Sequence, residues 1–397
     1  MTRFTIASFN VKNLIGADQE YYRFQVYTEE EFAWKQDWLA DQLLTMDADI
    51  VGFQEIFEES ALKAVIDETD LRGTEANEAN VPGRNKPYRK KAIFKKLKYE
   101  GYGEAALAFA PNMHDGAPGE RRPGVAILSR FGFVDAPQVI QDLPAPLDIP
   151  FQELGGGDGG HYRISRLSRP ILKVRIPVGD QTITVFNCHL KSKLGEFPRP
   201  ATGTAPEADL TQYDAAGRAL GSLRAAVRRM AEAWVLRRAI LDELEHGRPV
   251  MVLGDFNDGE HAVSSEIISG EVPFKNYSWM LRHDAKAPND RYTKEENEQI
   301  QADVAAVRLH SAEKLFVQKS LRDMVYTTAF GGTFESIDQI YMSQHFVPGH
   351  DASIGEMEYF SVLNDHLTDG SHPEAPYNKL ASDHGQIMAH IRLDHPD

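Results

Sequence analysis

Short apolar runs that end in polar residues recur along the whole chain. The most continuous of them, Val250–Leu253, leads into Gly254, with Asp255 and Asn257 following. An apolar run bounded by glycine is typical of a strand buried on both faces. Along an extended backbone Asp255 and Asn257 point the same way, with Phe256 opposite. This stretch alone fits a strand-end turn as well as a binding site, because Asp, Asn and Gly are common turn formers.

Other segments show the same alternation or helical spacing. We predict further strands at residues 4–10, 49–55, 124–130, 169–176, 182–189, 336–343 and 386–391. Helical spacing predicts a helix from Glu29 to Met46, and another from Thr293 onward. A long helix before the central strand carries an apolar stripe of Leu220, Val227, Trp234 and Leu241. We expect the many arginines of this helix to be solvated.

Composition and charge narrow the class of protein. The 397 residues carry a formal charge of -16, which argues against a generally basic surface that coats nucleic acid. A phosphodiester substrate stays compatible, because a metal and a few cations can reverse the sign locally. The single cysteine, Cys188, excludes an intramolecular disulfide and a cysteine zinc cluster. Without a signal-like or membrane-spanning segment, we expect a cytoplasmic protein, and the sequence indicates no obligate protein partner.

Polar residues of ligand or acid–base type lie at the ends of six separate predicted strands. They are Asn10, Glu55, His189, Asp255 with Asn257, Asp338, and Asp383 with His384. Each one alone fits an ordinary turn, and a lone histidine is more often structural than catalytic. Six in one chain are harder to attribute to turns, and short, ordered connections can bring such strand ends to one rim.

These residues resemble the motifs of a known family. The matching positions are Asn10, Gln54-Glu55, Asn187–His189, Gly254–Asn257, Ile337-Asp338 and Ser382–His384. Their order and spacing are similar to those of the endonuclease/exonuclease/phosphatase superfamily, the DNase I-like fold, and His189–Lys193 is most like its bacterial nuclease-type members. The resemblance implies an α/β (α+β) fold, a four-layer α/β/β/α sandwich of two facing mixed sheets flanked by helices. We expect one domain over residues 1–397, with polar insertions near 72–99, 142–160 and 271–320.

The resemblance also implies a divalent cation, Mg2+ or Mn2+. It makes Glu55 the primary metal ligand, assisted by Asn10. Asp255, Asn257 and Asp383 would hold the water, the phosphate or a second metal. Ligation by oxygen atoms alone suits a hard cation that keeps several waters.

Catalytic roles are carried over in the same way. His384, oriented by Asp338, suits a base or a phosphate stabiliser, and Asp255 is the rival base. His189 would act as acid or as hydrogen-bond donor to the phosphate. Lys191 and Arg169 would be cationic clamps on the substrate. Glu120 is a candidate partner of His189, although a surface acid beside Arg121 and Arg122 is the better explanation.

The resulting hypothesis is a metal-dependent phosphodiesterase, a nuclease that acts on DNA or RNA. A basic run from Arg84 to Lys98 supports a polyanionic substrate, although a solvated loop also explains it. The alternative is a phosphatase or phospholipase-type enzyme that acts on inositol phosphates or lipid head groups. A third possibility is a non-catalytic binding protein of the same fold.

Overall fold

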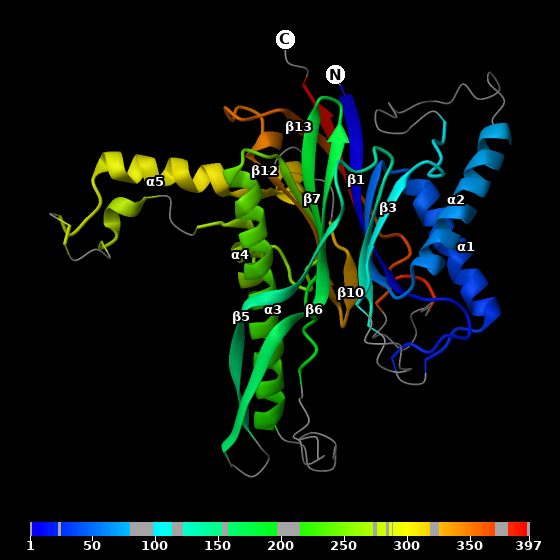
Figure 1. The fold of residues 1–397 in the computed structure, drawn as a ribbon, viewed down its shortest axis with the longest axis horizontal. Coiled ribbons are helices and arrows are strands. Elements are labelled where there is room, and N and C mark those ends of the chain that lie inside the picture. The colour runs from blue at the N-terminus through cyan, green and yellow to red at the C-terminus, as the bar shows by residue number, and fades with distance from the viewer. Residues whose placement is uncertain are drawn as a thin grey trace.

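Two facing β-sheets form the centre of the protein in the computed structural model (Figure 1). The structure describes residues 2–22, 25–79, 98–112, 122–152, 158–196, 215–272, 276–282, 286–287, 289–317, 325–369 and 380–394. Over these residues the strands form two six-stranded sheets and a two-stranded ribbon, β10 (Thr328–Phe330) with β11 (Thr333–Glu335).

Each sheet combines one parallel strand pair with antiparallel neighbours. The first has the order β13 (Gly355–Leu363), β14 (Gln386–Leu393), β1 (Thr2–Leu14), β2 (Ile50–Ile56), β4 (Gly124–Ser129), β3 (Ala106–Ala110). The second has the order β5 (Gln138–Gln152), β6 (Asp158–Val178), β7 (Gln181–His189), β8 (Val250–Asp255), β12 (Asp338–Ser343), β9 (Leu309–Ser311). The parallel pairs are β1 with β2 and β7 with β8, so both sheets are mixed, as predicted.

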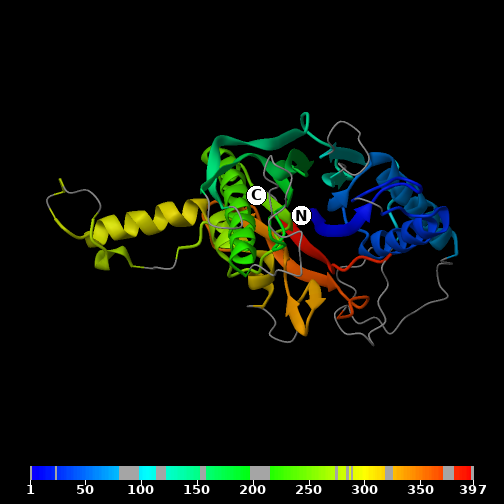
Figure 2. The same ribbon diagram turned by 90° about the horizontal axis from the view of Figure 1, so that it is seen from below.

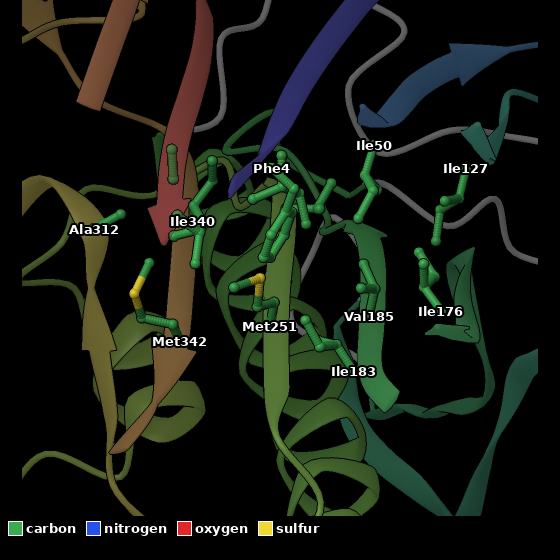
Figure 3. Packing of buried hydrophobic residues seen from close by; sticks show 14 of the residues in the cluster. Phe4, Ile50, Ile127, Ile176, Ile183, Val185, Met251, Ala312, Ile340 and Met342 are labelled. Carbon is green, nitrogen blue, oxygen red and sulfur yellow. The ribbon is translucent and has the colours of Figure 1, made fainter. Parts of the chain in front are cut away.

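The main core lies between the sheets. Alternate residues of facing strands, such as Ile6, Ile50, Val185, Met251 and Ile340, pack there and are at most 1% exposed. Figure 3 shows this packing around Met251 and Val185. Burial on both faces explains why the central strands have nearly continuous apolar sequences.

Helices cover the two outer faces. On the first sheet lie α1 (Glu29–Met46) and α2 (Glu59–Ala79), whose apolar side chains pack against those of β1 and β2. The start of α1 is fixed by a capping box between Thr28 and Glu31. On the second sheet lie α3 (Ala215–Glu245) and α4 (Val263–Ser269). The four-layer sandwich is therefore confirmed.

The segment that follows α4 extends away from the sandwich. Its helix α5 (Lys294–Val307) begins at the Thr293 cap, has no buried residue, and projects to one side (Figure 2). The predicted polar insertion near 271–320 ends earlier than expected, because β9 joins the second sheet and α6 (Ala312–Val317) packs into the core. The remaining elements are the short 3-10 helices η1 (Tyr277–Trp279) and η2 (Gln344–Phe346).

Two expectations about loops and helix faces were wrong. Most of the predicted polar insertion near 142–160, which we expected to be a surface loop, lies in the paired strands β5 and β6 instead. Pro144 and Pro146 are tolerated because β5 is an edge strand, where a missing N–H need not break the ladder. On α3, Trp234 is 44% exposed, whereas the side chains of Arg224 and Arg229 are buried. Buried arginines are stable there because each finds oxygen partners, such as Asp258 for Arg229 at 2.6 Å.

The first predicted insertion, 72–99, is helical at its start, because α2 continues to Ala79. The basic residues from Arg84 to Lys96, and also Glu120, lie outside the described residues. None of the described helices combines the length and the apolar character that crossing a membrane requires.

Candidate active site

The polar site residues lie on the strand faces that also build the core. Side chains two or four residues apart on a strand share a face, so an inward apolar residue predicts an inward polar residue near the strand end. The pairs related in this way are Ile6 and Asn10 on β1, Val185 and His189 on β7, Leu253 and Asp255 on β8, and Ile340 and Asp338 on β12. The site is thus the polar end of the space between the sheets.

Strand register brings three of these side chains into one row. Asp255 is the cross-strand neighbour of His189 on β7 and of Asp338 on β12. The Nε2 atom of His189 lies 3.3 Å from Asp255 Oδ2. The close approach of β7 and β8 requires Gly254, since a Cβ there would collide with the Cys188 carbonyl oxygen.

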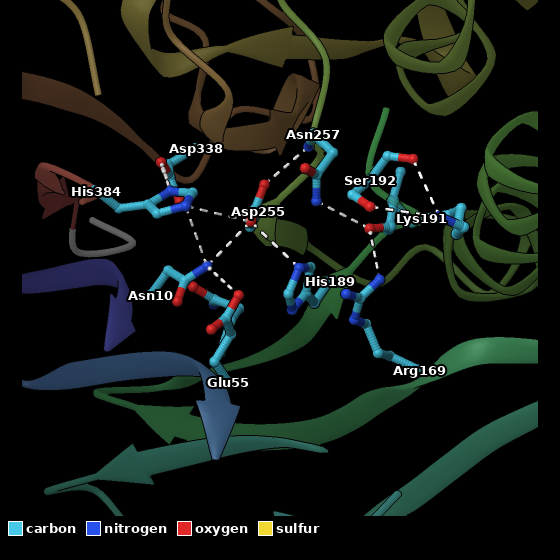
Figure 4. Close-up of polar contacts among 12 residues, drawn as sticks. Asn10, Glu55, Arg169, His189, Lys191, Ser192, Asp255, Asn257, Asp338 and His384 are labelled. Atoms are coloured by element: carbon cyan, nitrogen blue, oxygen red, sulfur yellow. Dashed lines mark hydrogen bonds and ion pairs between the residues drawn. The ribbon is translucent and has the colours of Figure 1, made fainter. Parts of the chain in front are cut away.

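Asn10 connects this row to the opposite sheet (Figure 4). Its Nδ2 group donates to Asp255 Oδ2 at 3.0 Å and to Glu55 Oε1 at 3.4 Å. Its Oδ1 atom accepts from the Lys12 backbone N–H at 3.0 Å. Asn10 therefore holds two carboxylates together by donating to both, and its role as a metal ligand stays a prediction.

Glu55 reaches the site through an irregular backbone. The pairing of β2 with β4 shifts between Gln54 and Ile56, and Glu55 has a φ of 65°. Regular alternation would turn Glu55 toward the helices with Phe53, so the bulge redirects it toward Asn10. Its Oε2 atom accepts from the Asn13 N–H at 3.0 Å.

Left-handed backbone conformations gather at this rim. Besides Glu55, Lys12, Asn13 and Asn257 have φ angles of 52°, 53° and 54°. Such conformations are costly for residues other than glycine and cluster at functional sites. Asn257 uses its conformation to donate from Nδ2 to the Leu190 carbonyl at 3.0 Å and from its backbone N–H to Asp255.

His384 and Asp338 form the predicted carboxylate–imidazole pair. Nδ1 of His384 lies 2.8 Å from Asp338 Oδ2, and its Nε2 lies 3.8 Å from Asp255 Oδ2. Burial disfavours the charged imidazolium, but the charges of Asp338 and Asp255 outweigh burial and raise the pKa of His384 well above its usual value. Without a bound cation, these charges favour the protonated form of His384, whereas ligation of a cation by its ring would require the neutral form.

Burial shifts the pKa values of Asp255 and His189 in opposite directions. It raises the pKa of Asp255 to about 7, although the charge of His384 acts against the shift. It lowers the pKa of His189 well below its usual value, and Arg169 adds to the effect. Asp255 can thus take up or release a proton near neutral pH, whereas His189 is a neutral imidazole.

Asp383 lies at the margin of the site. Its exposed side chain pairs with Lys12 at 3.5 Å. Burial of part of the carboxyl raises the pKa of Asp383, but the charges of His384 and Lys12 outweigh it and leave this pKa below the usual value.

A cleft of about 630 Å³ runs from these residues to a wall rich in cations. Arg169 and Lys191 line it beside His189, and their role as substrate clamps stays a prediction. Arg169 donates to the Leu190 carbonyl at 3.3 Å, and Lys191 donates from Nζ to the Leu194 carbonyl at 2.8 Å. Burial and the charge of Arg169 lower the pKa of Lys191.

The donor set fits a divalent cation. Ligand atoms of Asp255, Asp338 and His384 all lie within 4.8 Å of one another. Asp338 Oδ1 is buried and has no hydrogen-bond partner among the described residues. Glu55 adds further carboxylate oxygens. Apart from histidine, the hydrogen-bond partners of Glu55 and Asp255 among the described residues are uncharged N–H groups. Hard cations prefer such oxygen ligands.

Sequence reasoning missed the residues that support the site. Glu232 on α3 is 2% exposed and accepts from the backbone N–H groups of Ser168 and Lys191, both at 2.7 Å. Gln54 donates to Asn187 Oδ1 at 2.7 Å and so bridges the sheets beside the site. Glu232 follows Arg228 and Arg229 by one helical turn, and this charged stripe was the available signal.

Comparison with protein families gives the class of the protein. The model of the Endonuclease/Exonuclease/phosphatase family matches residues 7–384, so the chain belongs to this family. Members of the family are hydrolases that act on phosphoester bonds and usually use a divalent metal. No curated protein sequence matches the chain.

Three different proteins are among the solved structures in which the chain follows a similar course. An endonuclease/exonuclease/phosphatase family protein from Bacteroides thetaiotaomicron has 14% identity and a TM-score of 0.46, over 99% of both chains. Truncated TDP2 from Caenorhabditis elegans has 12% identity and a TM-score of 0.44, over 98% of this chain and 97% of that chain. A mannosyl-6-phosphatase from Bacteroides thetaiotaomicron has 14% identity and a TM-score of 0.43, over 98% and 100%.

Proposed function

We propose that this protein is a Mg2+- or Mn2+-dependent phosphodiesterase that cleaves nucleic acid. The observation that carries the proposal is the composition of the cleft. One end has the carboxylates Glu55 and Asp255 with two histidines, and the wall beside it has Arg169 and Lys191. The first end suits a cation and a reacting phosphate, and the second suits the charge of an extended polyanion.

Glu55 is the proposed main metal ligand, and Asp255 faces it across Asn10. A bound divalent cation would neutralise these carboxylates and stabilise negative charge that develops on phosphate oxygens. Asn257 and Asp383 stay candidates for holding water or phosphate, since both lie at the rim of the same site.

Proton positions divide the catalytic roles between Asp255 and His384. Because the pKa of His384 is raised, its imidazolium serves as a fixed positive charge toward the phosphate, oriented by Asp338. Without a bound cation the pKa of Asp255 is about 7, so Asp255 is the better candidate for the base that accepts a proton from the attacking water, provided that it does not itself ligate the cation. The neutral imidazole of His189 donates one N–H, which favours the donor role over the acid role.

Hydrolysis of plasmid DNA, structured RNA and bis(p-nitrophenyl) phosphate tests the proposal. We expect cleavage that needs Mg2+ or Mn2+ and stops with EDTA. Glu55→Gln and His384→Ala should each lower the rate at least a hundredfold. Glu59→Gln is the matched control, because Glu59 is an exposed residue of α2 that pairs with Lys63.

Other outcomes would identify the alternatives. Release of phosphate from inositol phosphates without cleavage of any nucleic acid would replace the nuclease by a phosphatase. Full activity in both Glu55→Gln and His384→Ala would overturn the assignment of the site. Binding without hydrolysis of any of these substrates would indicate a non-catalytic protein.

A further inference from the structure

The cationic wall of the cleft has unusual charge for this chain. Arg166, Arg169, Lys191 and Arg228 all line it, in a protein with a formal charge of -16. A concave surface that collects cations against the overall charge attracts anions.

Arg228 is occupied by the protein itself. Its guanidinium donates to both Glu196 carboxylate oxygens at 2.9 Å and to the Arg166 carbonyl at 3.0 Å. This bidentate pair is neutral as a unit and anchors the backbone of β6 at Arg166. Arg228 is thus a positioning residue.

Arg166 has a neutral partner in the described part of the chain. Its Nη2 group donates to Asn112 Oδ1 at 3.4 Å. Asn112 is 3% exposed and is itself fixed, since it donates to the Ser168 carbonyl at 2.7 Å. A guanidinium has five donors in a planar fork that fits two oxygens of a phosphate. Arg166 therefore has a fixed position and no ion pair among the described residues, although Asp142 is its cross-strand neighbour on β5.

Ser168 gives a second, independent observation. It lines the cleft between Arg166 and Arg169, and its Oγ is buried without a hydrogen-bond partner among the described residues. Its backbone is held on both sides, by Glu232 at the N–H and by Asn112 at the carbonyl. An unpartnered buried hydroxyl is costly unless a ligand or water completes it.

Arg169 and Arg166 serve different ends of the cleft. Arg169 donates to the carbonyl of Leu190, which directly follows His189, so it lies at the reacting end. Arg166 precedes it by three residues on β6, where the pairing with β5 shifts, and both side chains line the cleft. Two anionic groups of one ligand can therefore be bound at the same time.

We propose that Arg166 and Ser168 form a subsite for a second phosphate group of the substrate, next to the phosphodiester that is cleaved. This inference rests on the proposed function and narrows its substrate class. The preferred substrate is a phosphodiester that carries a neighbouring phosphate, as in an oligonucleotide, and a simple isolated diester is a poorer one.

Matched dinucleotides test this subsite. We compare kcat/KM for TpT, which has one phosphodiester, with pTpT and TpTp, which add a terminal phosphate at either end. One of the phosphorylated forms should be cleaved at least tenfold more efficiently than TpT, the effect of one charge-assisted hydrogen bond. In Arg166→Ala this ratio should fall to about one. Ser168→Ala should lower it by a smaller factor.

Arg163→Ala is the control on the same strand, because Arg163 is exposed and pairs with Asp148. It should keep the ratio of the unchanged protein. A ratio of one in the unchanged protein, or an equal loss for TpT and pTpT in Arg166→Ala, would overturn the subsite.

Binding of the same dinucleotides in EDTA separates this inference from the proposed function. If no phosphodiester is hydrolysed but the terminal phosphate still tightens binding through Arg166, the subsite stands and the nuclease assignment falls. If diesters are hydrolysed and the terminal phosphate changes neither binding nor rate, the nuclease assignment stands and the subsite falls.

Discussion

Lys35 offers a sharp test of the physical reasoning, because it is a fully buried lysine beside the site. Its Nζ donates to the carbonyls of Val11, at 3.0 Å, and Leu380, at 3.1 Å. These contacts connect the end of β1 to the segment that carries Asp383 and His384. Burial, and then the charge of Lys12, lower the pKa of Lys35 from 10.5 to about 7.

This shift makes stability depend on pH. Between pH 7 and 10.5 the unfolded chain holds a proton on Lys35 that the folded protein lacks, so stability rises with pH. A shift of 3.5 units corresponds to about 5 kcal/mol in total, of which about 2 kcal/mol is recovered between pH 7 and pH 9. The variant Lys35→Met cannot titrate and should lack this gain.

Urea unfolding of both proteins at pH 7, 8 and 9, without metal, measures the effect. The unfolding free energy of the unchanged protein should rise by about 2 kcal/mol more than that of Lys35→Met. Coincident fluorescence and circular dichroism transitions check that one transition is measured. Lys63→Met, at an exposed position of α2, should follow the unchanged protein. A constant difference between the unchanged protein and Lys35→Met from pH 7 to 9 would refute the reasoning.

Three further predictions concern the site and its support. In a thermal-shift assay, addition of Mg2+ should raise the melting temperature more at pH 8 than at pH 6, because protons compete with Mg2+ for Asp255 below its pKa of about 7. The variant Asp255→Asn should lose this pH dependence. Asn187→Leu should lower the unfolding free energy by about 3 kcal/mol in urea, because it removes three buried hydrogen bonds, one from the Gln54 amide and one from each of two backbone carbonyls. A loss below about 1 kcal/mol would contradict the inter-sheet bridge. Asp338→Asn should lower kcat by about 10²–10⁴-fold and move the alkaline limb of the pH profile to lower pH, because His384 loses the charge that raises its pKa.

Local patterns were sufficient for most of the fold. The apolar spacing predicted the bounds of α1, and alternation predicted the paired strands β6 and β7. The resemblance of the strand-end motifs supplied the order of the layers, and the family match is consistent with it. These features depend on residues close together in sequence, so the sequence carries them directly.

Alternation also determined much of the site. Asn10 lies four residues after Ile6, and Asp255 lies two residues after Leu253, so both turn inward with the core. Convergence on one rim then follows, because the parallel strands of each sheet end at the same edge.

Only the tertiary structure decided the positions that break the local pattern. Glu55 reaches Asn10 through a bulge with a φ of 65°, which pairing with the neighbouring strands stabilises. Glu232 and Arg229 look like solvated helix residues, yet they are buried because Lys191 and Asp258, distant in sequence, supply their partners. A sequence pattern reports which residues can be buried, whereas the burial of a charge depends on a partner that only the folded chain provides.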